Sequence, residues 1–121
     1  MALVSFEIIS VPVSDQQAAK RFYHEVLGFD LVREAPMGPG MSWIQLAPKG
    51  CGTTIALVTW FETMRPGGLQ GVMLNSTDIE ADHAALTGRG LVLADIKQEP
   101  WGRYATFTDP DGNGWILRQA P

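Results

Sequence analysis

The sequence repeats one order of secondary-structure signals twice, and this repetition constrains the fold more than any other feature. Asp15 and Asp78 each follow a strand-like segment and stand where the N-cap of a helix is expected. Gly28 and Gly90 each stand where the helix that follows would end. The two copies are offset by about 60 residues, a period that indicates a duplicated module. The sequence therefore predicts two modules, each built as a strand, a helix and three strands.

Hydrophobic periodicity and turn residues set the expected boundaries within each copy. The first copy is expected to hold its strand, helix and three strands at residues 6–13, 16–27, 29–34, 41–46 and 53–60. The second copy is expected to hold them at residues 71–76, 78–89, 91–96, 103–108 and 115–118. Turns are expected at residues 36–40, 48–52, 99–102 and 109–113, where Gly, Pro, Asn and Asp gather.

Residues 61–69 contain Pro66, Gly67 and Gly68, which predict a linker between module one (residues 1–60) and module two (residues 70–121). A module of about 60 residues buries too little surface to be secure alone. The two modules should therefore pack together or pair with the modules of a second chain. The predicted fold class is α+β, with one domain formed from tandem βαβββ modules.

Charge and composition exclude several classes of protein. The net charge is −4 and there is no basic stripe, so neither nucleic acid nor an anionic membrane surface is an expected partner. No apolar run reaches the roughly 18 residues of a membrane span. Residues 1–9 carry Glu7 and no basic residue, unlike a secretory signal. Cys51 is the only cysteine, so no internal disulfide is possible, and a reducing cytoplasm is the expected location.

Two stretches of the sequence resemble a known family. VPVSDQQAAKRFYHEVLGFDLV (Val11–Val32) is similar to the opening of vicinal oxygen chelate proteins, and WGRYATFTDPDGNGWILRQ (Trp101–Gln119) is similar to their closing hairpin. This superfamily includes glyoxalases, bleomycin-resistance proteins and dioxygenases. The resemblance covers essentially the whole sequence and implies tandem βαβββ modules that form a curved mixed sheet around a cleft. Because the fold hosts many reactions, it does not select one of them.

The resemblance also implies where a metal would bind. In enzymes of this superfamily, His, Gln or Glu side chains from four strands hold a divalent metal. The matching positions in this sequence are Ile8, Ala56, Gly71 and Ile116. Hydrocarbon offers no lone pair, so neither a metal nor another cofactor is expected here. Glu7 and Gln70 could bind a metal, but a shift of one residue along a strand turns each side chain to the opposite face.

Strand alternation selects the side chains expected to line the cleft and bind a ligand. They are Ile8, Ser10, Trp43, Gln45, Ala56, Val58 and Trp60 from the first module, and Met73, Asn75, Tyr104, Thr106, Ile116 and Arg118 from the second. Trp43, Trp60 and Tyr104 could stack on a flat ligand. Arg118 could pair with a carboxylate or phosphate, and Gln45 could fix the ligand's orientation. Several of these side chains could instead fill the interior or a dimer interface.

Four functions remain open at this point. The preferred prediction is a metal-free, homodimeric binding protein that sequesters a small hydrophobic or aromatic molecule. The alternative is a metal-dependent glyoxalase-like lyase or isomerase, or a dioxygenase, with displaced ligands. A metal-free enzyme would have to use Ser10, Tyr104 or Arg118, and no nucleophile–base pair is visible among them. The fourth is a purely regulatory or structural module with a filled cleft. His24 and His83 are expected on helices, the first solvated and the second half-buried.

Overall fold

The computed structural model describes residues 1–121 and divides the chain into two compact units, Met1–Pro66 (unit 1) and Gly67–Pro121 (unit 2). Each unit holds one α-helix and one mixed four-stranded sheet, and unit 1 adds a π-helical turn. The order of strand, helix and three strands occurs in both units, which confirms the predicted α+β fold. Neither α-helix has the length and apolar composition that crossing a bilayer requires.

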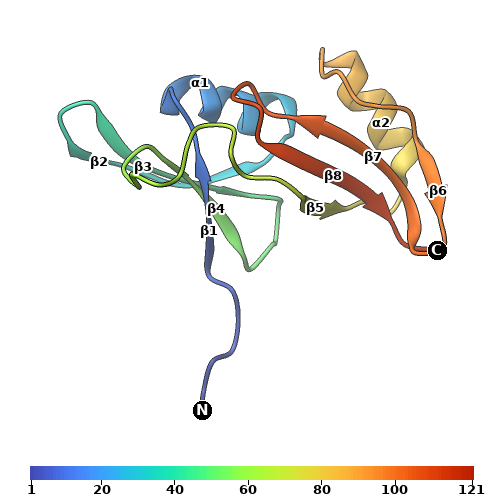
Figure 1. Ribbon diagram of the computed structural model, residues 1–121, viewed down its shortest axis with the longest axis horizontal. Coiled ribbons are helices and arrows are strands. Elements are labelled where there is room, and N and C mark those ends of the chain that lie inside the picture. Colours follow the sequence, from blue (N-terminus) through green and yellow to red (C-terminus); the bar gives the residue numbers. More distant parts are fainter. The chain divides into compact units, whose positions relative to one another are not determined.

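Unit 1 contains β1 (Ile8–Pro12), α1 (Gln16–Arg21), the π-helical turn η1 (Phe22–Val26), β2 (Asp30–Gly38), β3 (Met41–Ala47) and β4 (Thr54–Val58). Its strand order is β1-β4-β3-β2, with β1 parallel to β4 and the other pairs antiparallel. Helix α1 lies over one face of this sheet, where it contacts β3 and β4 (Figure 1). Val11, Ile44 and Leu57 have no exposed surface and form part of the core of unit 1.

The helical segment of unit 1 begins and ends where the sequence predicts. The Asp15 carboxylate accepts a hydrogen bond from the Ala18 backbone N at 3.0 Å, as an N-cap residue does. Gly28 follows the segment with a φ of 75°, a conformation that glycine adopts without steric cost. Between these ends the backbone widens into η1, where Leu27 N donates to Phe22 O at 3.2 Å. The apolar spacing did not predict this wider turn.

Unit 2 contains β5 (Val72–Asn75), α2 (Ile79–Gly88), β6 (Lys97–Glu99), β7 (Gly102–Thr108) and β8 (Gly114–Gln119). Its strand order is β5-β8-β7-β6, with β5 parallel to β8. Helix α2 contacts β7 and β8 (Figure 1). Phe107 and Trp115 pair across these two strands with ring centroids 6.3 Å apart and planes at 8°. Both rings are buried, so this stacked pair belongs to the core of unit 2.

The turn at residues 109–113 joins β7 to β8, as predicted. Asp109 N donates to Asn113 O at 3.0 Å, and Asp109 Oδ1 accepts from the backbone N of Asp111 and of Asn113, both at 2.9 Å. Gly112 supplies the left-handed residue that the turn needs, with a φ of 96°. Asp109 is 4% exposed and Asn113 has no exposed surface, so this polar turn is part of the folded interior.

The strand predicted at residues 91–96 is wrong, because β6 begins only at Lys97. Leu91 is buried and explains the apolar pattern, whereas Val92 is 87% exposed. The backbone hydrogen bond from Ala94 N to Thr106 O, 3.0 Å long, is not continued as a ladder. Buried and exposed side chains alternate in this segment because Leu91 packs into the core, and not because the segment pairs as a strand.

The turn predicted at residues 36–40 is also too long, since β2 continues through Gly38 and Pro36 pairs with Ser42. Strand β2 lies at the edge of the sheet, where a proline without an N–H is tolerated. The chain reverses at residues 39–40, with a φ of 69° at Gly40. Strand β1 is likewise shorter than predicted, because it begins at Ile8 rather than at residue 6.

Candidate ligand-binding site

The sheet of unit 1 has a second face, opposite α1, and the strand register fixes which side chains share it. Ser10 pairs with Ala56, and Ala56 pairs with Gln45, so these three residues form one row across the sheet. Residues two positions apart on a strand point to the same side. This face therefore carries six of the residues that sequence reasoning selected for ligand binding: Ile8, Ser10, Trp43, Gln45, Ala56 and Val58.

Two indoles stack beside this face and form what we call the Trp43–Trp60 pair. Their ring centroids are 6.2 Å apart and their planes meet at 26°. Trp60 lies just beyond the end of β4, and the Phe61 ring follows at 6.1 Å from Trp60, with Phe61 47% exposed. Sequence reasoning assigned Phe61 to the linker and missed it. Two adjacent aromatic residues directly after a buried strand were the signal that could have found it.

Hydrogen bonds between side chains hold the Trp43 indole in place. Trp43 Nε1 donates to Gln45 Oε1 at 3.0 Å, and Gln45 Nε2 donates to Thr54 Oγ1 at 2.8 Å. Thr54 Oγ1 in turn lies 3.4 Å from the Glu7 carbonyl oxygen, which also accepts from Thr54 N at 3.1 Å. Gln45 thus has both ends of its amide engaged within the chain, and it orients Trp43 directly.

The sheet of unit 2 also has a face opposite its helix. Pairing of β8 with β5 and β7 produces two rows on this face, Asn75–Arg118–Tyr104 and Met73–Ile116–Thr106. These are the six residues that sequence reasoning selected from the second module. Met73 is 45% exposed, and Asn75 and Thr106 are also exposed. This face therefore presents both apolar and polar groups to its surroundings.

A second stacked pair, the Trp101–Tyr104 pair, lies at the end of this face. The two ring centroids are 4.8 Å apart and the planes meet at 28°. Trp101 stands in the turn between β6 and β7, and its carbonyl oxygen accepts hydrogen bonds from Arg118 Nε at 2.9 Å and Nη2 at 2.6 Å. Part of the Arg118 guanidinium is therefore occupied with the turn. The buried Gly102 follows, where a Cβ would overlap the backbone oxygen of Gln119.

A hollow of about 360 Å³ opens within unit 2. It is lined by Gln70, Gly71, Thr106, Phe107, Thr108, Gly114, Trp115 and Ile116. Thr106 and Ile116 belong to the face described above, so the hollow adjoins that face. Gly71 has a φ of 81°, and no atom lies within 4 Å of the position that its Cβ would take. The missing side chain of Gly71 contributes to this open space.

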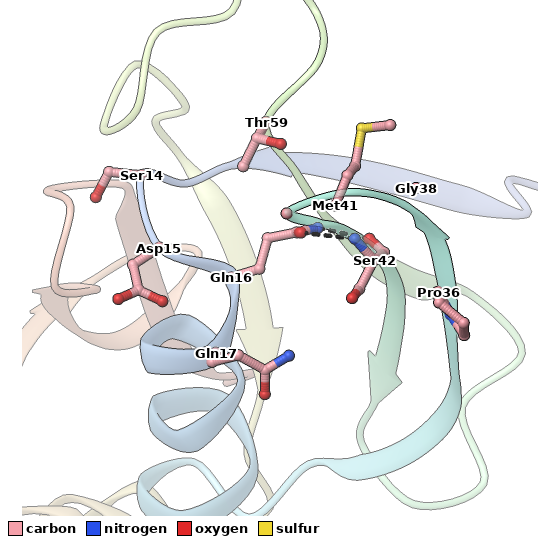
Figure 2. Close-up of a pocket in the computed structure, with 10 residues that line it drawn as sticks. Ser14, Asp15, Gln16, Gln17, Pro36, Gly38, Met41, Ser42 and Thr59 are labelled. Atoms are coloured by element: carbon pink, nitrogen blue, oxygen red, sulfur yellow. Dashed lines mark hydrogen bonds between the residues drawn. The ribbon is translucent and has the colours of Figure 1, made fainter.

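A larger groove, of about 450 Å³, lies in unit 1 where α1 meets the β2–β3 hairpin (Figure 2). None of the residues that sequence reasoning selected lines it. Gln16, which is 8% exposed, donates from Nε2 to the carbonyls of Ser42 at 2.6 Å and Leu57 at 2.8 Å. Its Oε1 accepts from Ser42 N at 3.0 Å. This fully engaged amide ties α1 to the sheet, and we assign the groove a structural role.

Comparison with known proteins identifies the family. Residues 5–117 match the model of the Glyoxalase/Bleomycin resistance protein/Dioxygenase superfamily. The chain belongs to this superfamily. It is 49% identical to TnmS3, an antibiotic binding protein from Streptomyces sp. CB03234, with a TM-score of 0.95 over 100% of this chain and 99% of TnmS3. A glyoxalase/bleomycin resistance protein from the same strain is 50% identical, with a TM-score of 0.85 over 95% and 100% of the two chains.

Proteins from bacteria other than Streptomyces are also similar to this chain. Protein YetH of Bacillus subtilis (strain 168) is 36% identical in an alignment 115 residues long, which covers 92% of this chain and 94% of YetH. A superfamily protein from Sphaerobacter thermophilus DSM 20745 is 34% identical, with a TM-score of 0.87 over 97% and 98% of the two chains. The fold and the family predicted from the sequence are thereby confirmed.

The four positions that match metal ligands in enzymes of this superfamily do not fit a metal. Ile8, Ala56, Gly71 and Ile116 offer no nitrogen, oxygen or sulfur donor from a side chain. The left-handed backbone at Gly71 also strains any residue that carries a side chain. No group of three or more His, Cys, Asp or Glu side chains is arranged to hold an ion.

Three of the remaining candidate donors, Gln70, His24 and His83, have structural roles. Gln70 Nε2 donates to two backbone carbonyls, at 3.0 and 3.1 Å, within unit 2. His24 Nδ1 lies 2.7 Å from a backbone carbonyl just beyond η1, and His83 Nε2 lies 2.9 Å from one beyond α2. Each histidine thus ties its helical segment to the residues that follow. Neither histidine belongs to the rows of residues opposite the helices.

Proposed function

We propose that this protein reversibly binds a planar aromatic small molecule of the antibiotic class, without a metal and without changing it chemically. The observation that carries this proposal is the stacked aromatic pair associated with the sheet face opposite the helix in each unit. Flat rings held in stacked pairs offer contact area to another flat ring at little entropic cost.

The side chains on these two faces support binding over catalysis. The selected residues include no histidine, carboxylate or cysteine, which are the usual groups for proton transfer and nucleophilic attack near neutral pH. The full-length similarity to TnmS3, an antibiotic binding protein, supports a ligand of that class. In this proposal the Trp43–Trp60 pair of unit 1 and the Trp101–Tyr104 pair of unit 2 each offer a stacking surface for a flat ligand. The hollow beside Thr106 and Ile116 accepts an apolar substituent.

Isothermal titration calorimetry with doxorubicin and bleomycin A2 tests the proposal. The protein is first dialysed against EDTA, its metal content is measured, and the ligand is recovered afterwards for mass spectrometry. We expect saturable binding of at least one of the two antibiotics, no dependence on the chelator, and an unchanged ligand mass. If neither antibiotic binds nor shifts the melting temperature, the proposal is wrong. One tightly held transition metal per chain with a converted substrate would favour a glyoxalase-like lyase or isomerase, or a dioxygenase.

We further propose that the protein acts as a homodimer in the cytoplasm. Each unit is small, and exposed apolar residues such as Met73 remain on the face opposite its helix, which favours burial against a second copy or a ligand. Cys51 is exposed and unpaired, as suits a reducing compartment. Light scattering coupled to size-exclusion chromatography should give twice the 13.2 kDa mass of one chain. A monomer mass at micromolar concentration would contradict the dimer.

A further inference from the structure

We propose that Gln45 and Thr54 are positioning residues that hold the Trp43 indole stacked on Trp60 before a ligand arrives. This inference rests on the proposed function, because it concerns how tightly the Trp43–Trp60 pair binds a flat ligand. The observation behind it is the series of hydrogen bonds Trp43 Nε1 to Gln45 Oε1 (3.0 Å) and Gln45 Nε2 to Thr54 Oγ1 (2.8 Å).

Donor chemistry fixes the direction of every bond in this series. An indole N–H can only donate, so the Gln45 amide must turn its oxygen toward Trp43 and its NH₂ toward Thr54. The Thr54 hydroxyl must then accept from Gln45, and its own proton is directed to the Glu7 carbonyl oxygen 3.4 Å away. Because each group has one workable orientation, the amide of Gln45 cannot flip without breaking two hydrogen bonds at once.

The surroundings make this arrangement rigid. Thr54 is 7% exposed and lies on β4, where it neighbours Ile8 on the adjoining parallel strand. Its hydroxyl therefore has few water molecules available as alternative partners. Gln45 lies on β3 and pairs in register with Ala56, whose small side chain leaves the amide room to reach Thr54. The position of the Trp43 indole is consequently set by the register of β3 against β4 rather than by the segment that follows β4.

A prearranged indole changes both affinity and selectivity. Immobilising a loose side chain at the moment of binding weakens a complex by about 3- to 10-fold, and a side chain already fixed avoids that loss. The indole N–H is also engaged inside the chain, so this pair presents ring faces and no hydrogen-bond donor of Trp43 to a ligand. The Trp43 ring should therefore select for flatness of the ligand and be indifferent to polar groups along the ligand's edge.

Thr54→Val tests this role, because valine keeps the shape and removes the hydroxyl. Thr54→Ser keeps the hydroxyl and should rescue the wild-type behaviour. Thr53→Val is the matched control, since the Thr53 hydroxyl also bonds a backbone carbonyl, that of Phe6 at 2.7 Å, but takes no part in the series. Gln45→Met provides a second break in the series, in case Thr54→Val lowers the melting temperature too far.

Two measurements are made on all of these variants. The first is the circular dichroism couplet of the Trp43–Trp60 pair, defined as the signal that Trp60→Phe removes. The second is the dissociation constant for doxorubicin by calorimetry. We expect Thr54→Val and Gln45→Met to weaken the couplet and to raise the dissociation constant by about 3- to 10-fold. Thr54→Ser and Thr53→Val should change neither quantity.

The outcomes separate this inference from the proposed function. An unchanged couplet and affinity in folded Thr54→Val and Gln45→Met would overturn the positioning role while leaving ligand binding intact. An equal loss in Thr53→Val would overturn it as well, because the effect would then be one of general stability. If wild-type protein does not bind doxorubicin, the circular dichroism couplet alone decides. Loss of the couplet in Thr54→Val and its rescue in Thr54→Ser would support the positioning role. Persistence of the couplet in Thr54→Val would overturn that role.

Discussion

The two units share one topology, yet their faces opposite the helices differ in how far they are buried. In unit 1 every residue of β4 is buried, including Thr54, Ala56 and Val58 on the face opposite α1. In unit 2 the corresponding strand β8 alternates, and its neighbour Met73 on β5 is 45% exposed. One module therefore has an enclosed central strand, whereas the other leaves its face open.

The aromatic pairs of the two units are also held by different means. In unit 1 a hydrogen bond reaches the indole ring of Trp43 itself, through Gln45. In unit 2 the bonds from Arg118 reach the backbone oxygen of Trp101, and the Trp101 ring contacts Tyr104 by stacking. The two copies of the module therefore share their strand order, while each holds its aromatic pair by contacts of its own. We expect a rigid pair in unit 1 and an adaptable pair in unit 2.

The largest expected effect concerns Gly102, which directly follows Trp101 of the adaptable pair. Gly102→Ala places a methyl group against the backbone oxygen of Gln119 at a φ of 137°, so both overlap and backbone strain oppose it. We expect the free energy of unfolding to fall by about 2–4 kcal/mol in urea denaturation. Gly40→Ala, in the hairpin turn of unit 1 with open space around it, is the control and should lose only about 1 kcal/mol. Equal losses would show that the unit 2 turn is not tightly packed.

The next effect concerns ligand affinity and tests the comparison directly. Trp43→Ala removes a ring that is already fixed, and we expect the dissociation constant for doxorubicin to rise about 30-fold, as for a binding hot spot. Trp101→Ala removes a ring of the adaptable pair, which would lose mobility when the ligand binds. We therefore expect the dissociation constant to rise only about 3-fold. Calorimetric titration of both variants gives the ratio. A larger loss in Trp101→Ala than in Trp43→Ala would reverse our assignment of the rigid and adaptable pairs.

The smallest expected effect lies at the edge of unit 1, where Glu34 on β2 meets α1. Hydrogen bonds from Gln17 at 3.1 Å and from Lys20 at 3.0 Å lower the pKa of Glu34. A carboxyl whose pKa is lower in the folded state adds stability above its unfolded pKa and loses it as the pH falls through the folded value. Glu34→Gln should therefore cost less than about 1 kcal/mol at pH 7.

The difference in free energy of unfolding between wild type and Glu34→Gln should vanish when the pH is well below the ordinary glutamate pKa of about 4.3. Thermal unfolding followed from pH 7 to pH 3 measures it, with Glu25→Gln on the exposed side of η1 as the charge-matched control. A difference that grows as the pH falls would contradict the conclusion that folding lowers the pKa of Glu34.

Much of this architecture could be predicted from local sequence patterns. Asp15 and Asp78 mark helix starts because capping depends only on the three residues that follow, and both accept the expected backbone N–H. Alternation along strands assigned side chains to faces, since side-chain direction has a period of two residues. The predicted strand at residues 91–96 failed because alternation also arises where one apolar residue docks beside exposed neighbours.

The interactions within the candidate site could not be predicted in the same way. The bond between Gln45 and Thr54 depends on the register of β3 against β4, which no local pattern specifies. Arg118 was expected to meet an anion, but its hydrogen bonds to Trp101 depend on how the β6–β7 turn folds back over the sheet. Hydrogen-bond partners on different strands therefore could not be predicted from the sequence.

The left-handed backbone at Gly71 bears on how this scaffold could be redesigned. Ile8, Ala56 and Ile116 lie in extended strands with ordinary negative φ, so the backbone at each of them suits histidine or glutamate. At Gly71 any side chain that carries a donor would be strained, because a φ of 81° lies in the left-handed region that L-residues rarely adopt. A metalloenzyme engineered from this protein would therefore meet backbone strain at one of the four ligand positions and not at the other three.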